Sequence, residues 1–324
     1  ASLACEELEK AEVNVLFHTM PAAIEETDNG FRLTLCTKTG LEAFHARTLI
    51  DASGDAIAAG MAGYPVIEHD PRQPGTLMLS LTGYEYTGLD LDALDRAYRE
   101  AVAADELNDR DQVFVRNNIR GFLHARGDNC THITDIDGRT SAGRSEAELR
   151  SRVSLLRVYR FLRRQPGLEN LQIAFMAPEC GIRETVTIQG EAEITGEDYV
   201  SGRLWEDAVC YSFYPIDLHL PAGGGIDTRP LAPDTLPTVP RGALVPKGSK
   251  RLLVAGRCLS SDREANSALR VQATSMACGQ AAAVLAMQAI RENVPVMTVN
   301  MEAVYSLLRE HKAIVPQAGG PGET

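Results

Sequence analysis

The sequence has few features of a disulfide-stabilised or membrane-spanning protein. Its seven cysteines are odd in number and widely spaced, and none forms a C-x-x-C pair. This pattern argues against a disulfide framework or a cysteine zinc site. Scattered thiols are typical of a reducing compartment, so we expect a cytoplasmic protein. No run of 18 apolar residues occurs, so we expect no transmembrane helix and no membrane partner.

Positive charge is also scarce. The chain has 32 Lys and Arg against 44 Asp and Glu, a formal net charge of -12. This balance makes the protein a poor candidate for binding nucleic acid. Hydrophobic residues, by contrast, make up 44% of the 324 residues, which suffices for a sizeable core. The length favours two domains.

The first quarter of the sequence has the pattern of short strands. The apolar run Val13 to Phe17 predicts a buried strand. Asp28-Asn29-Gly30 is a strong hairpin signal, and it predicts pairing of the flanking segments. The segments expected to be strands are 22–26, 31–37, 41–46 and 47–52. The last of these ends in the turn Ser53-Gly54-Asp55.

The remaining sequence alternates predicted strands with longer helices. We expect strands at 76–82, 113–116, 131–134, 171–178, 185–188 and 251–255. We expect helices at 90–104, 145–164, 270–292 and 300–311, and a helical turn at 198–202. The Pro-rich stretch 221–242 predicts a long ordered loop or a crossing between domains.

Two strand-to-turn junctions are candidates for ligand binding. One is Leu49 to Asp55 and the other is Leu252 to Arg257. In open α/β sheets, ligands bind beyond the carboxyl ends of the strands, and glycine there allows close approach to the backbone. The alternative is that each junction only needs tight packing. The small-residue helix that follows from Ala268 has free N–H groups at its start that favour an anion, or it is a packed core helix.

Four ordered segments carry a resemblance to a known family. They are TLIDASGDAIAAGMAGYPV, DNCTHITDIDGRTSAGRSEAELRSRV, FMAPECGIRETVTIQGEAEITGEDYVSGRLWEDAVCYSFYPIDLHLP and LLVAGRCLSSDREANSALRVQATSMACGQAAA. Together they resemble FAD-dependent oxidoreductases with the glutathione-reductase type of fold. The resemblance runs from residue 13 to about residue 290.

The resemblance implies an α/β fold in which an incomplete, three-layer Rossmann-like FAD-binding domain carries an inserted α+β substrate domain. The expected FAD-binding domain is discontinuous and comprises 1–66 and 240–292. Residues 67–239 would form the substrate or cap domain, and 293–324 a C-terminal helix and tail.

The resemblance also assigns roles to individual residues. Pro21 or Ala22 would contact the adenine through the backbone. The residues near the adenosine or pyrophosphate would be Ser53, Gly54 and Asp55. Those approaching the pyrophosphate and ribityl chain would be Gly256 and Arg257. Those holding the isoalloxazine end would be Arg270, Val271 and Gln272.

The sequence departs from the family pattern in two places. It has no G-x-G-x-x-G segment, which in this family binds the FAD pyrophosphate within a βαβ unit of roughly 30 residues. We therefore expect either a truncated chain or a second chain that supplies the segment. The incomplete sheet would expose an apolar face and favour association, including a homo-oligomer. Second, Arg263 stands where the family carries a histidine.

Three residues are candidates for catalysis. Arg183 could bind a substrate carboxylate, since an arginine fork suits that group, or it could pair with Glu184 or Glu191. His219 could act as acid or base, or bond to a loop carbonyl. Tyr214 could donate to a substrate oxygen, or simply satisfy its own hydroxyl.

A metal site is not expected. The residues that invite one are His124, Cys130, His132, Asp135 and Asp137. Their spacing matches no standard zinc pattern, and no glutamate sits where a calcium loop requires it.

The sequence as a whole favours a flavoprotein oxidoreductase that passes a hydride from a small organic substrate to flavin N5. A non-catalytic subunit or remnant that binds a partner through its exposed sheet edge is the main alternative. A nucleotide-binding module without redox chemistry is a third. Each shares the fold, and fold alone does not fix function.

Overall fold

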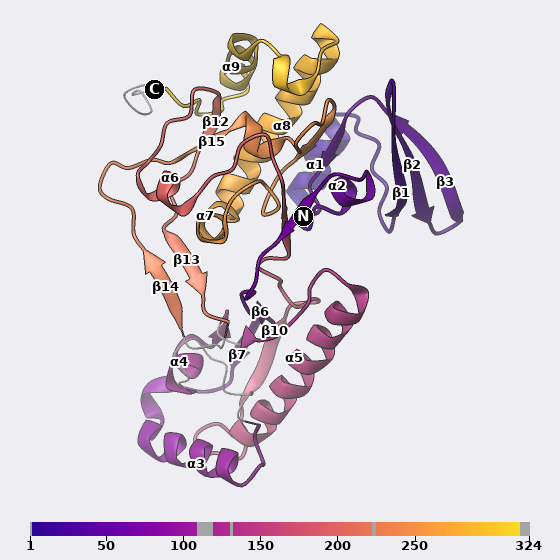
Figure 1. Cartoon of the computed structure of the whole chain (residues 1–324). Helices are drawn as coiled ribbons and strands as arrows, with labels where there is room; N and C mark the ends of the chain where they lie inside the picture. Colours follow the sequence, from indigo (N-terminus) through magenta and orange to yellow (C-terminus); the bar gives the residue numbers. More distant parts are fainter. Residues whose placement is uncertain (1, 109–118, 130–131, 222–224, 318–324) are drawn as a thin grey trace.

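The computed structural model describes residues 2–108, 119–129, 132–221 and 225–317 (Figure 1). The strand predicted at 113–116 lies outside these ranges, as do the first residue of the strand predicted at 131–134 and Cys130. Within the described residues, β9 is His132–Ile133.

The N-terminal segment differs from its prediction. Helix α1, Ser2–Lys10, has no buried residue, and the apolar run that follows it is not a strand. Val13, Val15, Leu16 and Phe17 are all exposed. The predicted buried strand is therefore wrong within the described chain. No described segment supplies the ladder of backbone partners that a buried strand needs.

A three-stranded antiparallel sheet follows. It contains β1, Met20–Thr27; β2, Gly30–Thr37; and β3, Gly40–Ala46, in the order β1-β2-β3. The predicted turn is present, with Thr27 paired to Gly30 and Gly30 at a φ of 139°. A Cβ at Gly30 would lie 2.1 Å from the Ala46 carbonyl oxygen, so glycine is required there.

A parallel pair of strands lies at the centre of the larger lobe. β4, Leu49–Asp51, pairs in parallel with β16, Leu252–Val254, about 200 residues later in the chain. Helix α8, Gln272–Glu292, packs on both strands. The mixture of helix and strand confirms the α/β class. Among the described residues this is the one parallel ladder, so a larger Rossmann-type sheet is not part of the observed arrangement.

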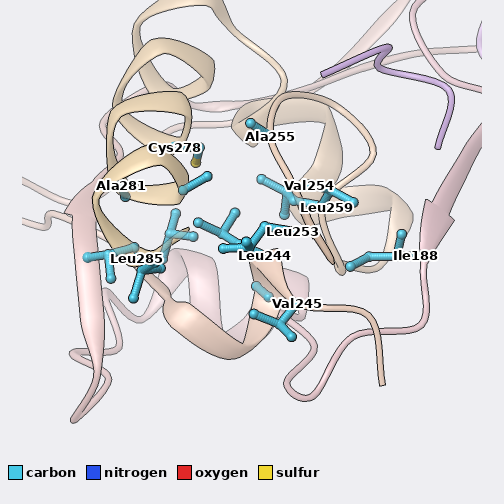
Figure 2. Close-up of a cluster of buried hydrophobic side chains, with 14 of the residues drawn as sticks. Ile188, Leu244, Val245, Leu253, Val254, Ala255, Leu259, Cys278, Ala281 and Leu285 are labelled. Atoms are coloured by element: carbon cyan, nitrogen blue, oxygen red, sulfur yellow. The ribbon is translucent and has the colours of Figure 1, made fainter. Parts of the chain in front are cut away.

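The larger core forms around this pair. Leu253, Val254 and Leu244 face Cys278, Ala281 and Leu285 of α8 (Figure 2). The small side chains of α8 allow the helix to approach the strands closely. Other helices also contribute to this core, among them α2, Ile57–Met61; α7, Arg263–Leu269; and α9, Met301–Glu310.

A second core fills the lobe drawn at the bottom of Figure 1. It is built from helices α3, Leu91–Ala103; α4, Ile119–His124; and α5, Ser141–Leu162. The strands are β6, Gly75–Thr76; β7, Leu79–Thr82; β8, Gly127–Asp128; and β10, Gln172–Met176. The predicted strand 76–82 is therefore interrupted at Leu77 and Met78.

Helix α5 buries some of its apolar side chains and leaves others exposed. Leu155 and Val158 are buried, whereas Leu149 and Val153 are 67% and 50% exposed. An apolar residue on a helix can face either a core or a cavity, and spacing does not distinguish them.

Three short antiparallel strand pairs are also present among the described residues. β5, Val66–Glu68, pairs with β11, Val186–Ile188; β12, Ala208–Tyr211, with β15, Thr238–Pro240; and β13, Ile216–His219, with β14, Ile226–Arg229. The predicted long loop at 221–242 therefore contains two strands. Within the described ranges the remaining elements are α6, Gly196–Val200, and the 3-10 turns Tyr86–Gly88, Arg241–Leu244 and Val296–Thr298.

The helix predicted at 270–292 is also corrected at its start. Arg270 is the C-cap of α7 and Val271 is the N-cap of α8, so the chain turns between two helices at these residues. By length and composition α8 could cross a membrane, but half of its apolar window is buried inside the protein, as in a core helix.

Candidate functional site

The turn after β4 is held by its own side chains. The Asp51 carboxylate accepts hydrogen bonds from the backbone N–H groups of Ser53, at 2.9 Å, and Ala59, at 3.0 Å. Ser53 Oγ accepts from the N–H of Ile57 at 3.1 Å, and Gly54 adopts a φ of 74°. The turn is thus rigid, because the side chains of Asp51 and Ser53 are hydrogen-bonded to backbone N–H groups of the protein itself.

Asp55 joins the two predicted ligand-binding turns and both lobes. Its carboxylate accepts hydrogen bonds from Arg257, at 2.6 Å, and from the Thr185 hydroxyl, at 2.8 Å. It also pairs with Arg144 of α5 at 2.7 Å. The structure therefore brings the Ser53–Asp55 turn and the Gly256–Arg257 turn together. Their contact with the cofactor remains a prediction.

The residues around Gly256 fit a ligand rich in hydrogen-bond acceptors. Gly256 has a φ of 90°, and a Cβ built on it meets nothing within 4 Å. Arg257 Nε is buried without a hydrogen-bond partner among the described residues. Helix α8 begins after Val271 with no side-chain cap, and Gln272 and Ala273 are exposed. Uncapped N–H groups and an open glycine suit the dinucleotide FAD.

Arg183 lies in a buried polar cluster between the lobes. It is 8% exposed and donates to the Pro74 carbonyl, at 2.5 Å, to Thr76 Oγ1, at 2.7 Å, and to Asn129 Oδ1, at 3.1 Å. Arg183 makes no ion pair with Glu184 or Glu191, so the structural alternative offered for this residue is wrong. Burial, with the nearby Arg270 charge, lowers the pKa of Arg183 to about 10. The side chain is still cationic at neutral pH.

Arg270 is a second cation in the same cluster. Its guanidinium donates to Asp217 O, at 3.3 Å, and Gln73 Oε1, at 3.4 Å, and its Nε has no partner among the described residues. Burial lowers its pKa, while Asp217 and Glu184 oppose that shift. A buried or partly buried arginine that makes no ion pair is costly, and neither Arg183 nor Arg270 makes one with a carboxylate among the described residues. Both side chains therefore favour an anion between the lobes.

Two histidines lie beside these arginines. The rings of His132 and His219 stack edge to face, with centroids 4.9 Å apart. His219 Nε2 is 3.7 Å from Asp217 Oδ2, and His219 Nδ1 has no described partner. Burial lowers the pKa of His219, Asp217 opposes the shift, and Arg183 adds to it. The imidazole is therefore neutral at neutral pH and can accept a proton.

His132 is the residue of the cluster whose pKa lies farthest from its ordinary value. It is 1% exposed, and neither ring nitrogen has a partner among the described residues. Burial lowers its pKa to about 3, with further contributions from Arg183 and His219. A buried polar side chain is normally hydrogen-bonded, so an unpartnered ring facing other polar groups indicates a ligand position.

The sequence patterns indicated Arg183 and His219 as separate candidates for catalysis, and the structure places them near each other. The same patterns marked His132 only as a possible metal ligand and pointed to neither Gln73 nor Asp217. Asp217 stands two residues before His219, on the same face of β13, which is a signal that alternation in a strand could have revealed. Gln73 comes from a distant segment and gave no such signal.

Gln73 connects this cluster to Arg263. Its backbone N–H and its side-chain amide both donate to the buried carboxylate of Glu184. The same carboxylate accepts from Arg263 Nε at 3.2 Å. Gln73 Oε1 in turn accepts from the N–H of His219 at 3.0 Å. Arg263 stands where the family pattern has a histidine. It is connected to the cluster through its ion pair with Glu184.

The structure gives less support for a catalytic role of Tyr214 than for one of Arg183 or His219. It is half-buried, and its backbone carbonyl accepts a 2.6 Å hydrogen bond from Tyr199. Its phenol acts on the pKa of Arg270, which places it near that cation. Tyr214 as a donor to substrate remains a prediction. No group of three metal-ligating side chains occurs in the part of the chain that the structure describes.

Comparison with known proteins identifies one family. Residues 1–308 match the family model described as FAD dependent oxidoreductase. No curated protein and no solved structure matches the chain. The family match covers more than nine-tenths of the sequence and confirms FAD as the cofactor.

Proposed function

Because the chain belongs to the FAD dependent oxidoreductase family, we propose that it oxidises a small organic anion whose acidic group lies between Arg183 and Arg270. The observation that carries the proposal is a pair of neighbouring cations, the buried Arg183 and the partly buried Arg270, that make no ion pair with a carboxylate among the described residues. Each retains positive charge at neutral pH, and a bound carboxylate would offset the cost of burying both.

FAD, when bound, supplies the N5 atom that accepts a hydride from the substrate carbon. The uncapped start of α8 and the open backbone at Gly256 support its placement in this lobe. We infer that residues 1–66 and 240–292 form its Rossmann-like binding domain, and that 67–239 covers it.

His219 is the proposed base. As the hydride leaves the substrate carbon, the neighbouring hydroxyl or amine must lose a proton, and a carbonyl or imine results. His219 Nδ1 is neutral and unpartnered among the described residues, so it can take that proton. Asp217, 3.7 Å from Nε2, would orient the ring and stabilise the imidazolium that forms. Tyr214 would donate to the substrate oxygen.

The burial of the cluster supports the same chemistry. Arg183 and His219 are less than 9% exposed, so water is largely excluded around them. In such surroundings the arginine charges act more strongly on a bound anion than they would in water.

The experiment uses the purified chain with added FAD. Short 2-hydroxy and 2-amino acids are mixed anaerobically, and bleaching of the flavin absorbance is followed. We expect bleaching with at least one acid, a raised KM for Arg183→Gln, and a lowered kcat for His219→Gln. Arg309→Gln, an exposed change on α9, is the matched control. A chain that stays colourless with excess FAD, or variants that match the control, would contradict the proposal.

A further inference from the structure

Gln73, in the segment between β5 and β6, contacts a carboxylate with one end of its side-chain amide and a cation with the other. Gln73 and Glu184 are each 4% exposed. The amide nitrogen of Gln73 donates to Glu184 Oε2 at 2.8 Å, and its backbone N–H donates to Glu184 Oε1. The amide oxygen accepts from the backbone N–H of His219 at 3.0 Å and from Arg270 Nη2 at 3.4 Å. One neutral amide therefore stands between a carboxylate and a guanidinium.

The orientation of this amide is fixed by its partners. A carboxylate only accepts hydrogen bonds, so the atom of Gln73 that faces Glu184 must be the nitrogen. A backbone N–H only donates, so the atom that faces His219 must be the oxygen. Reversing the amide would set acceptor against acceptor and donor against donor, which is costly for buried groups. Gln73 therefore presents a neutral acceptor to Arg270.

The negative charge of Glu184 is compensated on the side away from Gln73 by a different arginine. Glu184 Oε1 makes an ion pair with Arg263 Nε at 3.2 Å. In the part of the chain that the structure describes, no ion pair joins Glu184 to Arg270. Asp217 also acts on the pKa of Arg270, but its carboxylate makes its described ion-pair contact with His219. Arg270 therefore keeps its charge for another anion.

The shape of Gln73 could be matched by a glutamate, but the charge could not. Gln73→Glu would place a carboxylate oxygen where the amide oxygen now accepts from Arg270. An ion pair at that position would occupy the cation that the proposed function assigns to the substrate. The neutrality of the amide is thus the property of Gln73 that matters for binding an anion.

We propose that Gln73 is a specificity-determining residue of the anion site: its neutral amide keeps the Glu184 carboxylate paired with Arg263 and leaves the Arg270 cation for the acidic group of the substrate. The inference rests on the proposed function, because it concerns the same pair of cations, Arg183 and Arg270. It adds the residue that determines how strongly this site prefers an anion.

The test exchanges the two side chains in one double variant, Gln73→Glu with Glu184→Gln. The net charge of the protein stays the same, and each hydrogen bond described above keeps a donor and an acceptor. The new amide at position 184 donates to the new carboxylate at position 73, and its oxygen accepts from Arg263 Nε. Only the place of the negative charge changes, from the side of Arg263 to the side of Arg270.

Calorimetric titration of the FAD-supplemented full chain with acetate measures the anion affinity. The double variant should bind acetate at least about tenfold more weakly than the unmodified protein, because the carboxylate at position 73 pairs with Arg270. Glu184→Gln alone should instead tighten acetate binding, because it removes a negative charge that acts on Arg270. Gln172→Glu, an exposed change on β10, is the matched control and should bind acetate as the unmodified protein does.

A purely structural role for Gln73 predicts the opposite order. The double variant, which keeps the hydrogen bonds, would then retain its affinity for acetate, and Glu184→Gln, which weakens the Arg263 contact, would lose affinity. Either result overturns the inference, and the single variant decides the question if the double variant does not fold.

Arg183→Gln separates this inference from the function on which it rests. If acetate binding is lost in Arg183→Gln while the double variant binds acetate normally, only the role of Gln73 is overturned. Acetate binding that is unaffected by Arg183→Gln, or an unmodified protein that does not bind acetate, overturns the proposed anion site and the role of Gln73 together.

Discussion

Asp55 accepts a 2.6 Å hydrogen bond from Arg257, which lies 202 residues later in the chain. The same carboxylate pairs with Arg144 of α5 at 2.7 Å. One side chain thus connects the turn after β4, the turn after β16 and the lobe that carries α5. The relative position of the two lobes, and of the polar cluster between them, depends on this carboxylate.

Replacing Asp55 should therefore be strongly destabilising. Asp55→Ala leaves two partly buried arginines without their shared partner, and we expect a loss of about 3 kcal/mol in the free energy of unfolding. Urea denaturation measures it. Asp92→Ala removes an exposed partner of Arg120 and should cost less than about 1 kcal/mol. Equal losses in the free energy of unfolding for the two variants would show that Asp55 does not hold the two turns and α5 together.

His132 should make stability depend on pH in a defined window. Its folded pKa, about 3, lies below the ordinary value of 6.5, so the unfolded chain takes up a proton first as the pH falls. The stability it contributes is present above pH 6.5 and is lost towards pH 3. Between pH 7 and pH 5, this amounts to about 2 kcal/mol.

Urea denaturation of the unmodified protein and of His132→Gln at both pH values checks this expectation. The variant should lose about 2 kcal/mol less than the unmodified protein over that interval. The burial of His219 lowers its pKa in the same direction, so a residual slope is expected in the variant. Identical slopes in the two proteins would refute the assignment of the buried neutral ring.

Substitutions at Gly256 and Gly248 distinguish the cost of backbone strain from the loss of contact with FAD. Gly256→Ala places a Cβ on a residue at a φ of 90°, which should cost on the order of 1 kcal/mol or more. Gly248→Ala is a close match, with a φ of 80° and likewise nothing within 4 Å of the added Cβ. We expect similar losses of stability from both, but a weaker FAD affinity only for Gly256→Ala, as measured by flavin fluorescence titration. A comparable FAD affinity in both variants would place the cofactor elsewhere.

Leu285 tests the contact between α8 and the parallel strands. It is fully buried in the core shown in Figure 2. Leu285→Ala should destabilise the protein by about 2–5 kcal/mol, since it removes buried methyl groups and leaves a cavity. Leu3→Ala on α1, where the side chain is 71% exposed, should have little effect. Thermal unfolding of the two variants distinguishes them, and a small effect at Leu285 would argue against this packing.

Local signals in the sequence determined several elements. Asp28-Asn29-Gly30 indicated the β1–β2 turn because Gly30 alone tolerates its backbone geometry beside Ala46. The segments 47–52 and 251–255 predicted the two strands, observed as Leu49–Asp51 and Leu252–Val254, that pair in parallel. These signals succeed because they depend on neighbouring residues only. The run at 13–17 failed for the opposite reason, since a buried strand also requires a partner that its own sequence does not reveal.

The sequence by itself determined the family, the cofactor, and the residue types Arg183 and His219 as candidates, because four ordered segments carry that information. Only the tertiary structure decided that Gln73, His132 and Asp217 join them. These residues come from three separate segments, and their contacts form only when the lobes pack. Burial is likewise a property of the assembled fold. Burial lowers the pKa of His132 and so keeps its ring neutral. The packing of the lobes surrounds Arg183 with neutral acceptors and no carboxylate partner among the described residues. No pattern in the linear sequence specifies either property.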